Sequence, residues 1–246
     1  MLNQFTYYQQ NLLLLYNLSS KIKFKVKNFY EKYSKEFDAT RQKPWQEVIY
    51  YSRIFKENWI IADIGCGNCR HSIHLLSRNC LVIGLDISYN LIRLAKKKVK
   101  NNFLFYPIVC DALHIPLKNE SVNGIISVAL IHHIPFKINR LRFVNECIRI
   151  LNKNGLIITT AWNLLKIKHI FKALLEYPFY KINQEIAEFG DVYLRWGKYA
   201  KRYFHLFTLK ELVKTFNSKK LKILLFSSFG KGMIKDNHII IAKKNN

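Results

Sequence analysis

Apolar and amphipathic segments alternate along most of the chain. The apolar runs have the length of buried strands and lie at 59–64, 81–86, 103–109, 122–128, 155–161, 221–227 and 237–243. The stretches that repeat apolar residues at helical spacing lie at 69–78, 88–99, 137–151 and near 208–216. This rhythm predicts an α/β fold: a doubly wound, seven-stranded, mostly parallel sheet that ends in a C-terminal antiparallel hairpin.

Two regions depart from the rhythm. In residues 21–27, basic and apolar residues alternate strictly, which is typical of an edge strand or of a basic arm. Residues 163–205 are aromatic, basic and irregular, as expected of a cap or insert. We therefore expect a basic N-terminal extension over 1–27. A single domain would follow over 28–246, opening with helices at 28–38 and 44–55 and carrying a cap at about 163–205.

The composition adds a strong positive charge. Forty Lys and Arg face sixteen Asp and Glu among 246 residues, which gives a formal net charge of +24. A polyanion such as a nucleic acid is the natural partner of such a surface, and a bias of the genome toward Lys, Asn and Ile is the alternative. No apolar stretch is long enough to span a bilayer, and no basic residue precedes the apolar start. With five unevenly spaced cysteines, we expect reduced thiols, no disulfide framework and a cytoplasmic protein, or a nuclear one in a eukaryote.

The clearest candidate site is a glycine turn that directly follows the first strand. Asp63, Gly65 and Gly67 end that strand, and Asp86 ends the next one, 21 positions after Gly65. Glycines let the backbone approach a ligand closely, and an acid at the second strand can accept hydrogen bonds from ribose hydroxyls. Asp111 follows the third strand, where it could bind the amino group of adenine. Ligands in such folds bind at the carboxyl ends of the strands, so these residues predict a nucleoside site.

Known phosphate-binding loops do not fit this turn. A dinucleotide site would need Gly where the chain has Arg70, and the Gly-Lys-Ser/Thr of a phosphate-binding loop is absent. S-adenosylmethionine (SAM) carries no phosphate and needs no such cradle. We therefore expect SAM as the cofactor, with Ile87, Ala112 and Val128 completing its pocket. The alternative is an α/β scaffold that binds no ligand.

Several short segments carry a resemblance to a known family. Segments 63–68, 84–86, 110–113 and 151–155 resemble the successive motifs of class I SAM-dependent methyltransferases. Segments 29–33, 40–45, 127–133, 160–162 and 202–207 resemble the tRNA methyltransferases that act on carboxymethylated wobble uridine. The resemblance implies tRNA as a partner and a small zinc-binding activator subunit. The chain departs from the family at Cys69, where the family usually has a third glycine and where a side chain could crowd the cofactor.

The resemblance also implies a carboxylate as the methyl acceptor. A carboxylate is ionised at neutral pH and needs a cation to orient it rather than a general base. Arg202 and Arg41 are our first candidates, and His132 and His205 are further catalytic candidates. The expected walls of the substrate pocket are Lys43, Trp45, Trp162, Trp196 and Tyr203.

Other patterns leave alternatives open. Cys66 and Cys69 lack a second pair at matching spacing, so we expect no metal. The stripe formed by Arg93, Lys96, Lys97 and Lys100 is typical of a solvated helix face. The interleaved aromatic and basic residues at 195–205 fit either a base-stacking surface or a packed lid. A methyltransferase of quinone-like small molecules and a catalytically silent RNA-binding module remain the rival functions.

Overall fold

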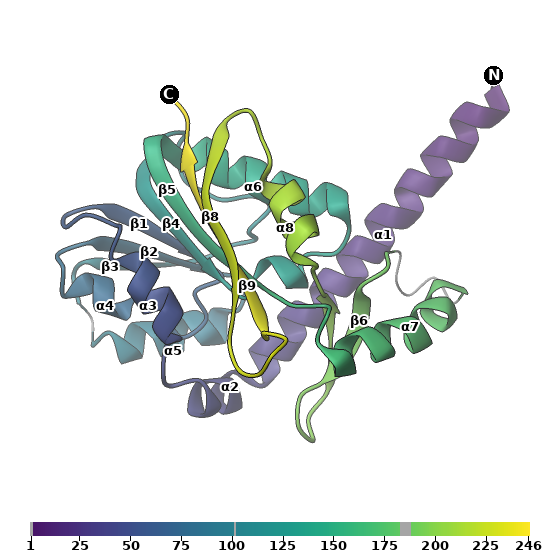
Figure 1. Cartoon of the computed structure of the whole chain (residues 1–246), viewed down its shortest axis with the longest axis horizontal. Coiled ribbons are helices and arrows are strands. Elements are labelled where there is room, and N and C mark those ends of the chain that lie inside the picture. Colours follow the sequence, from purple (N-terminus) through teal and green to yellow (C-terminus); the bar gives the residue numbers. More distant parts are fainter. Residues whose placement is uncertain (1, 101, 183–187) are drawn as a thin grey trace.

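A seven-stranded sheet forms the centre of the computed structural model, which describes residues 2–100, 102–182 and 188–246. The strand order is β3-β2-β1-β4-β5-β9-β8, with β1 to β5 parallel and β9 antiparallel to both β5 and β8 (Figure 1). The predicted sheet and its antiparallel ending are therefore confirmed. The strands are β1 Ile60–Ile64, β2 Leu81–Asp86, β3 Phe105–Val109, β4 Val122–Val128, β5 Leu151–Trp162, β8 Leu221–Phe229 and β9 Asn237–Lys244.

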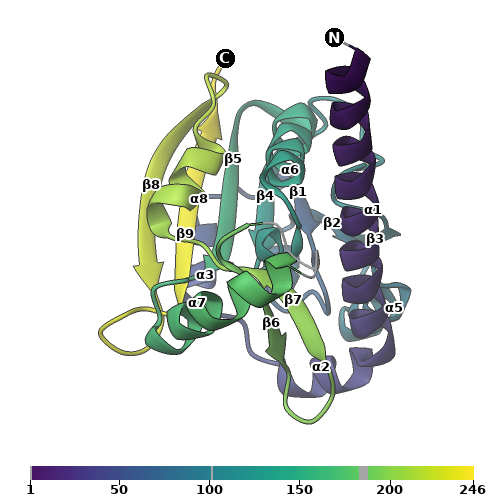
Figure 2. The same cartoon turned by 90° about the vertical axis from the view of Figure 1, so that its right-hand side faces the viewer.

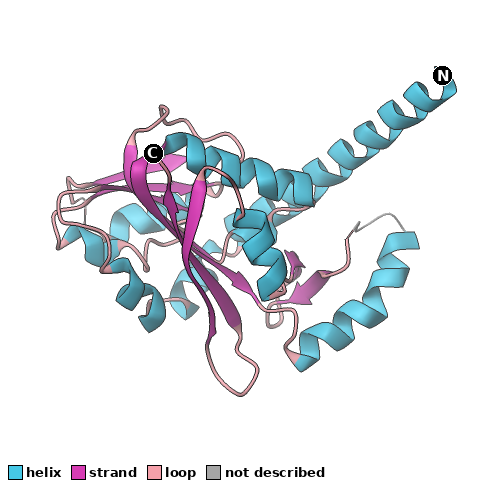
Figure 3. Ribbon diagram, turned by 45° about the horizontal axis from the view of Figure 1, so that its top comes forward, coloured by secondary structure: helices cyan, strands magenta, loops and turns pink. Residues whose placement is uncertain are grey.

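Helices cover both faces of this sheet (Figure 3). One core joins the strands to α6 and α8, and a second core joins them to α3, α4 and α5. Side chains cap the N-termini of two helices. At α5, Ser88 accepts a hydrogen bond from the backbone N–H of Leu91, and at α8, Thr208 accepts one from the backbone N–H of Glu211. The helices are α1 Leu2–Lys32, α2 Ser34–Thr40, α3 Gln46–Ser52, α4 Ile73–Leu76, α5 Tyr89–Lys98, α6 Lys137–Ile150, α7 Ile167–Ile182 and α8 Leu209–Phe216, with a short 3-10 turn, η1, at Ile131–His133.

The N-terminal region corrects one sequence expectation. Residues 21–27 belong to α1, so the edge-strand interpretation is wrong, and the helix runs across the expected boundary at residue 27. Ile22, Val26 and Phe29 recur at helical spacing and are buried, whereas Phe24 is 62% exposed. When apolar residues occur at every second position, some of them are four residues apart. Residues four apart also lie on one face of a helix, so the same pattern fits both structures. The first half of α1 projects beyond the rest of the molecule, and its second half lies against it (Figures 1 and 2).

The expected cap is more regular than its sequence indicates. It consists of α7 and an antiparallel hairpin of β6, Asp191–Arg195, and β7, Lys201–His205. The sequence hides these elements because Pro178 lies inside the helix and each strand has only five residues. The hairpin contacts α1 and η1, so the cap lies beside the carboxyl ends of the central strands.

No helix in the ranges described above is long and apolar enough to cross a membrane.

Candidate active site

A cavity lies where the carboxyl ends of β1, β2 and β4 meet the second half of α1 and the hairpin of β6 and β7. Its walls come from the glycine loop, the strand ends, α1, the loop before α3, η1 and β7. The parallel register places Asp63 beside Gly84 and Asp86 beside Val109, so the polar ends of adjacent strands come together. The sequence predicted a site at this edge of the sheet, and the cavity is there.

The glycine loop needs its glycines. Gly65 and Gly67 have φ angles of +73° and +54°, in the left-handed region. A Cβ on Gly65 would lie 2.9 Å from the Cβ of Leu130. Asp63 does not line the cavity: it is buried below the loop, where Ser72 Oγ donates to its Oδ2 at 2.5 Å. Burial raises the pKa of Asp63 to about 7, although the Ser72 hydrogen bond opposes the shift.

Asp86 and Asp111 line the same side of the cavity in different electrostatic settings. Asp86 accepts from the backbone N–H groups of Gly67 and Ser88, each at 2.9 Å. Burial nevertheless raises the pKa of Asp86 to about 6. Burial acts on Asp111 in the same direction, but the hydrogen bonds from Lys23 Nζ at 2.7 Å and from the backbone N–H of Leu113, together with the charge of Lys23, outweigh it, so the pKa of Asp111 is lowered. The acid that ends β2 therefore holds its negative charge less firmly than the acid that follows β3.

These residues fit an adenosine. The carboxylate oxygens of Asp86 each take one backbone donor, which leaves lone pairs for two ribose hydroxyls. Apolar side chains flank the same part of the cavity and can enclose a purine ring. Seven of the eight residues expected at the cofactor line the cavity, and Asp63 is the exception. The seven are Gly65, Gly67, Asp86, Ile87, Asp111, Ala112 and Val128.

Cys69 takes up little of this space. Its φ angle is +63°, which a glycine would adopt without strain and which explains the glycine usual at this position. The side chain is fully buried, packs with the core on the α4 side, and lies 3.1 Å from Ser72 Oγ. It does not line the cavity, so the expected crowding of the cofactor is absent.

Three arginines also line the cavity: Arg41, Arg70 and Arg202. Within the described part of the chain, none of them forms an ion pair with a carboxylate. Burial lowers the pKa of Arg70 to about 10 and that of Arg41 below its usual value, and the arginines add to this by repelling one another. Arg202 is only 7% exposed, and its Nε is buried with no hydrogen-bond partner among the described residues. Arg70 and Arg202 are buried and Arg41 is half-buried, and cations in such settings that pair with no described carboxylate favour an anionic ligand.

His132 and His133, the two histidines of η1, are both buried and lie close to Arg202. Burial lowers the pKa of His132 well below its usual value, and the neighbouring His133 and Arg202 lower it further. The ring is therefore neutral, and its Nδ1 accepts from the backbone N–H of Trp162 at 3.3 Å. Its Nε2 then carries the proton and can donate a hydrogen bond.

The other predicted substrate and catalytic residues divide into two groups. Trp45 and Trp162 line the cavity, as do Arg41, Arg202 and His132. Lys43 is exposed, and Trp196 packs between Phe29 and Tyr199 without lining the cavity. Tyr203 and His205 alternate with Arg202 and Phe204 along β7 and face the opposite side, so the structure does not bring them to the cavity.

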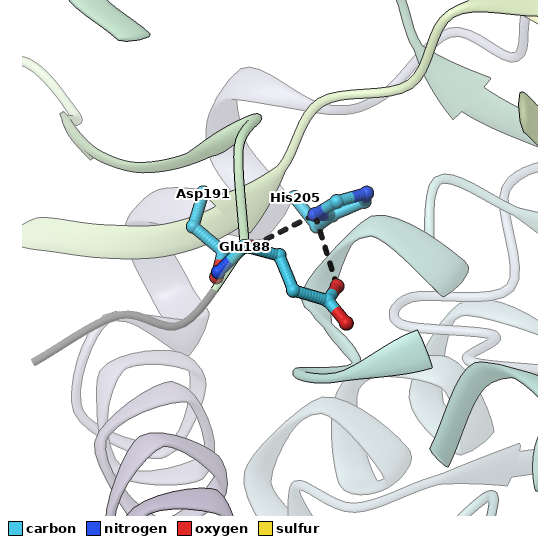
Figure 4. Close-up of side chains that lie close together, drawn as sticks. All are labelled: Glu188, Asp191 and His205. Atoms are coloured by element: carbon cyan, nitrogen blue, oxygen red, sulfur yellow. Dashed lines mark hydrogen bonds and ion pairs between the residues drawn. The ribbon is translucent and has the colours of Figure 1, made fainter. Parts of the chain in front are cut away.

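His205 belongs to a separate polar cluster with Glu188 and Asp191 (Figure 4). Their ligand atoms lie within 4.8 Å of one another, which is compact enough for a metal ion. However, Arg140 Nη2 already contacts Glu188 and lies 3.7 Å from Glu211. His205 donates to Asp191 at 2.8 Å and to Glu211 at 2.7 Å, and these two bonds raise its pKa although burial opposes them. We interpret the cluster as an ion network that fastens the hairpin to α6 and α8.

Sequence reasoning missed several lining residues. Ser19, Lys23, Val26 and Tyr30 line the cavity from α1 and recur at helical spacing, so a helical interpretation of 19–30 would have grouped them on one face. Arg70 and His133 were also missed as site residues. Arg70 entered the sequence argument only as a missing glycine, and His133 stood beside the preferred His132.

Comparisons with known proteins identify a methyltransferase domain in the chain. A methyltransferase domain model matches residues 62–159. The chain is 30% identical over 137 residues to tRNA (carboxymethyluridine(34)-5-O)-methyltransferase ALKBH8 of Mus musculus, a match that covers 56% of this chain and 20% of that protein. The chain thus spans about a fifth of that relative's length. The chain is also 28% identical over 239 residues to the tRNA (carboxymethyluridine(34)-5-O)-methyltransferase of Schizosaccharomyces pombe. This match covers 89% of the chain and 96% of the relative.

Solved structures show the same fold. A SAM-dependent methyltransferase of Methanosarcina mazei has a TM-score of 0.69 at 22% identity, covering 82% of this chain and 99% of that one. The methyltransferase in a complex with the Haloferax volcanii Trm112 methyltransferase activator has a TM-score of 0.65 at 12% identity, covering 90% and 98%. The chain therefore contains a methyltransferase domain with the fold of SAM-dependent methyltransferases, and its sequence resembles the tRNA carboxymethyluridine methyltransferases.

Proposed function

We propose that this chain transfers a methyl group from SAM to the carboxylate of a carboxymethyl group on a wobble uridine of tRNA. The observation that carries the proposal is the set of three cavity arginines with no acidic partner among the described residues. A carboxylate is the acceptor that such a set fits, and the relatives named above act on carboxymethyluridine.

The acidic side of the cavity would hold the cofactor. Gly65 and Gly67 would let the backbone approach SAM, Asp86 would accept from the ribose hydroxyls, and Asp111 from the adenine amino group. Asp63 would act indirectly, because it holds the loop through Ser72. SAM supplies a methyl group on a positively charged sulfur, which departs with the electron pair of the broken bond.

The arginine side would hold the acceptor. One carboxylate oxygen forms the new bond to the methyl carbon, and no proton has to be removed because the acid is already ionised. Arg202 would orient the carboxylate, and His132 would donate from Nε2. Arg41 and Arg70 would serve the same carboxylate or the carboxylate of the methionine moiety of SAM. Rate acceleration then comes mainly from alignment of oxygen, methyl carbon and sulfur on one line.

The rival functions fit the cavity less well. A neutral, quinone-like acceptor gives no reason to line the cavity with three arginines that pair with no described carboxylate. A silent RNA-binding module gives no reason to keep the cavity's glycine loop and free carboxylate lone pairs. A methyltransferase of small carboxylic acids is the alternative that the same cavity supports, and it requires no tRNA.

The surface charge supports tRNA as the partner. With a formal net charge of +24, the chain should bind polyanions with an affinity that falls by about 0.7–0.9 log units per phosphate contact for each tenfold rise in salt. We also propose a small activator subunit, because a structural relative is described in complex with the Trm112 methyltransferase activator.

The decisive experiment is methylation of tRNA from cells that lack the endogenous activity. Purified chain, with and without a Trm112-type subunit, is incubated with methyl-labelled SAM, and the digested nucleosides are analysed by mass spectrometry. We expect the label in the methyl ester of carboxymethyluridine. Label in another nucleoside would refute the proposed acceptor. Transfer to free carboxylic acids and never to tRNA would favour the small-molecule alternative.

A further inference from the structure

A buried chain of hydrogen bonds connects Arg202 to the backbone of β7 through α1 and η1. Arg202 Nη1 lies 2.6 Å from the hydroxyl oxygen of Tyr30, and that hydroxyl lies 2.8 Å from His133 Nε2. His133 Nδ1 in turn lies 2.9 Å from the carbonyl oxygen of Tyr203. Arg202, Tyr30 and His133 all line the cavity. None of the sequence motifs gave Tyr30 or His133 a function.

The position of each proton in this chain follows from its partners. The carbonyl oxygen of Tyr203 can only accept, so His133 Nδ1 carries a proton and donates it. Burial lowers the pKa of His133 to about 3, and Arg202 lowers it too, so the ring is neutral and Nε2 has a free lone pair. The Tyr30 hydroxyl therefore donates to Nε2, and its oxygen accepts from Arg202 Nη1. Burial also raises the pKa of Tyr30, which keeps the phenol protonated.

This arrangement orients the guanidinium with a neutral acceptor. A carboxylate in place of Tyr30 would hold Arg202 equally well but would cancel the charge that an anionic acceptor needs. The central carbon of the guanidinium lies over four aromatic rings, those of Phe29, Tyr30, Trp196 and Phe204, at 4.7–5.5 Å from the ring centroids. These contacts stabilise a cation without neutralising it.

We propose that Tyr30 is a positioning residue for methyl transfer: held by His133, it fixes the orientation of Arg202 toward the acceptor while leaving the arginine's charge available. The inference rests on the proposed function and deepens it. It also gives α1 a function at the active site, because Tyr30 lies in the last turn of that helix, two residues before its end at Lys32.

The first test compares Tyr30→Phe with Tyr33→Phe. Tyr33 also packs against Phe29, with Tyr199 as its second aromatic neighbour, and its hydroxyl forms no hydrogen bond with a described residue. Under single-turnover conditions with saturating SAM and tRNA, Tyr30→Phe should lower the methylation rate by about 10- to 100-fold. SAM affinity should change by less than about threefold, and Tyr33→Phe should react at nearly the wild-type rate. A wild-type rate for Tyr30→Phe, or an equal loss in Tyr33→Phe, would overturn the proposal.

A double-mutant cycle separates positioning from general damage to the fold. If Tyr30 acts through Arg202, Tyr30→Phe should change the rate by less than about twofold in an Arg202→Ala background. An undiminished loss in that background would show that Tyr30 acts independently, which contradicts the proposal.

A third measurement does not depend on the methyl acceptor. Nitrogen-15 spectra of the histidine side chains should show His133 protonated at Nδ1 alone, with an Nε2 resonance that shifts in Tyr30→Phe and not in Tyr33→Phe. Protonated Nε2, or a resonance that does not shift, would refute the hydrogen-bond chain itself. If the wild type methylated no tRNA while these spectra matched expectation, the proposed function would fail and the network would stand.

Discussion

Two groups of charged residues line the cavity, here called the acidic end (Asp86 and Asp111) and the arginine end (Arg41, Arg70 and Arg202), and they are built in different ways. The acidic end comes from two strands that pair in parallel, β2 and β3. Asp86 ends β2, and Asp111 follows the end of β3. The arginine end comes from segments far apart in the chain. Arg41 lies between α2 and α3, Arg70 follows the glycine loop, and Arg202 lies on the β6–β7 hairpin.

This difference decides what the sequence can reveal. Once the strands are recognised, the sheet itself brings their polar carboxyl ends together, so the acidic end follows from a local pattern. No local pattern brings residue 41 to residue 202. At the arginine end, side chains from separate elements meet only through tertiary packing. The sequence therefore suggested these residues through the resemblance to a known family, and their proximity could not be derived from any local pattern.

The largest expected effect tests the arginine end. Arg202→Ala should lower the single-turnover methylation rate by about 100-fold or more, because the acceptor loses alignment, while SAM affinity stays nearly unchanged. Arg202→Lys should restore little, since an ammonium lacks the planar fork that grips two oxygens and cannot replace the guanidinium among its aromatic neighbours. Neutralising Arg93 and Lys97 together, on the exposed face of α5, should only weaken tRNA binding modestly. A full rate for Arg202→Ala would remove the residue from the reaction.

The same division explains which of the predicted residues line the cavity. Gly65, Gly67, Asp86 and Asp111 were expected at the cavity and line it, because their positions depend on strand ends alone. Tyr203 and His205 were chosen from the same segment as Arg202, but side chains alternate along a strand and the sequence did not reveal that β7 was one. Tyr30 was missed because the predicted helix began at residue 28. That boundary separated Tyr30 from the preceding residues of α1 that line the cavity.

The next prediction concerns the acidic end and its two unequal carboxylates. Asp86→Ala should weaken SAM binding by roughly ten- to a hundredfold, because ribose hydroxyls lose a charged acceptor. Asp111→Ala should weaken it less, by about three- to tenfold, because Lys23 already engages one of the Asp111 oxygens. Calorimetric titration of both folded variants measures this. Equal losses would mean that Lys23 moves away from Asp111 when SAM binds.

A pH titration sharpens the contrast further. Burial raises the pKa of Asp86 from its ordinary 3.8 to about 6, and SAM requires the ionised form. SAM affinity should therefore be greatest well above pH 6 and fall by up to about tenfold for each unit below it. Stability of the ligand-free chain has the opposite sign. Its folded state binds this proton more tightly than its unfolded state, so the contribution of Asp86 declines as pH rises through about 6. Affinity that is flat with pH in the wild type would show that Asp86 is ionised throughout.

The smallest expected effect lies in the glycine loop. Cys69 has a φ angle of +63°, and its side chain is buried in the core without lining the cavity. Cys69→Gly and Cys69→Ala both remove the buried sulfur, but only glycine relieves the left-handed backbone. We therefore expect Cys69→Gly to be more stable than Cys69→Ala by about 1 kcal/mol, the reverse of the usual order for these two residues.

Thermal unfolding of the two variants gives the difference in stability. Neither variant should alter SAM affinity by more than about twofold, since the sulfur lies outside the cofactor's space. If alanine proves more stable, the loop does not hold this backbone conformation. If either variant loses SAM binding, Cys69 contributes to the acidic end after all.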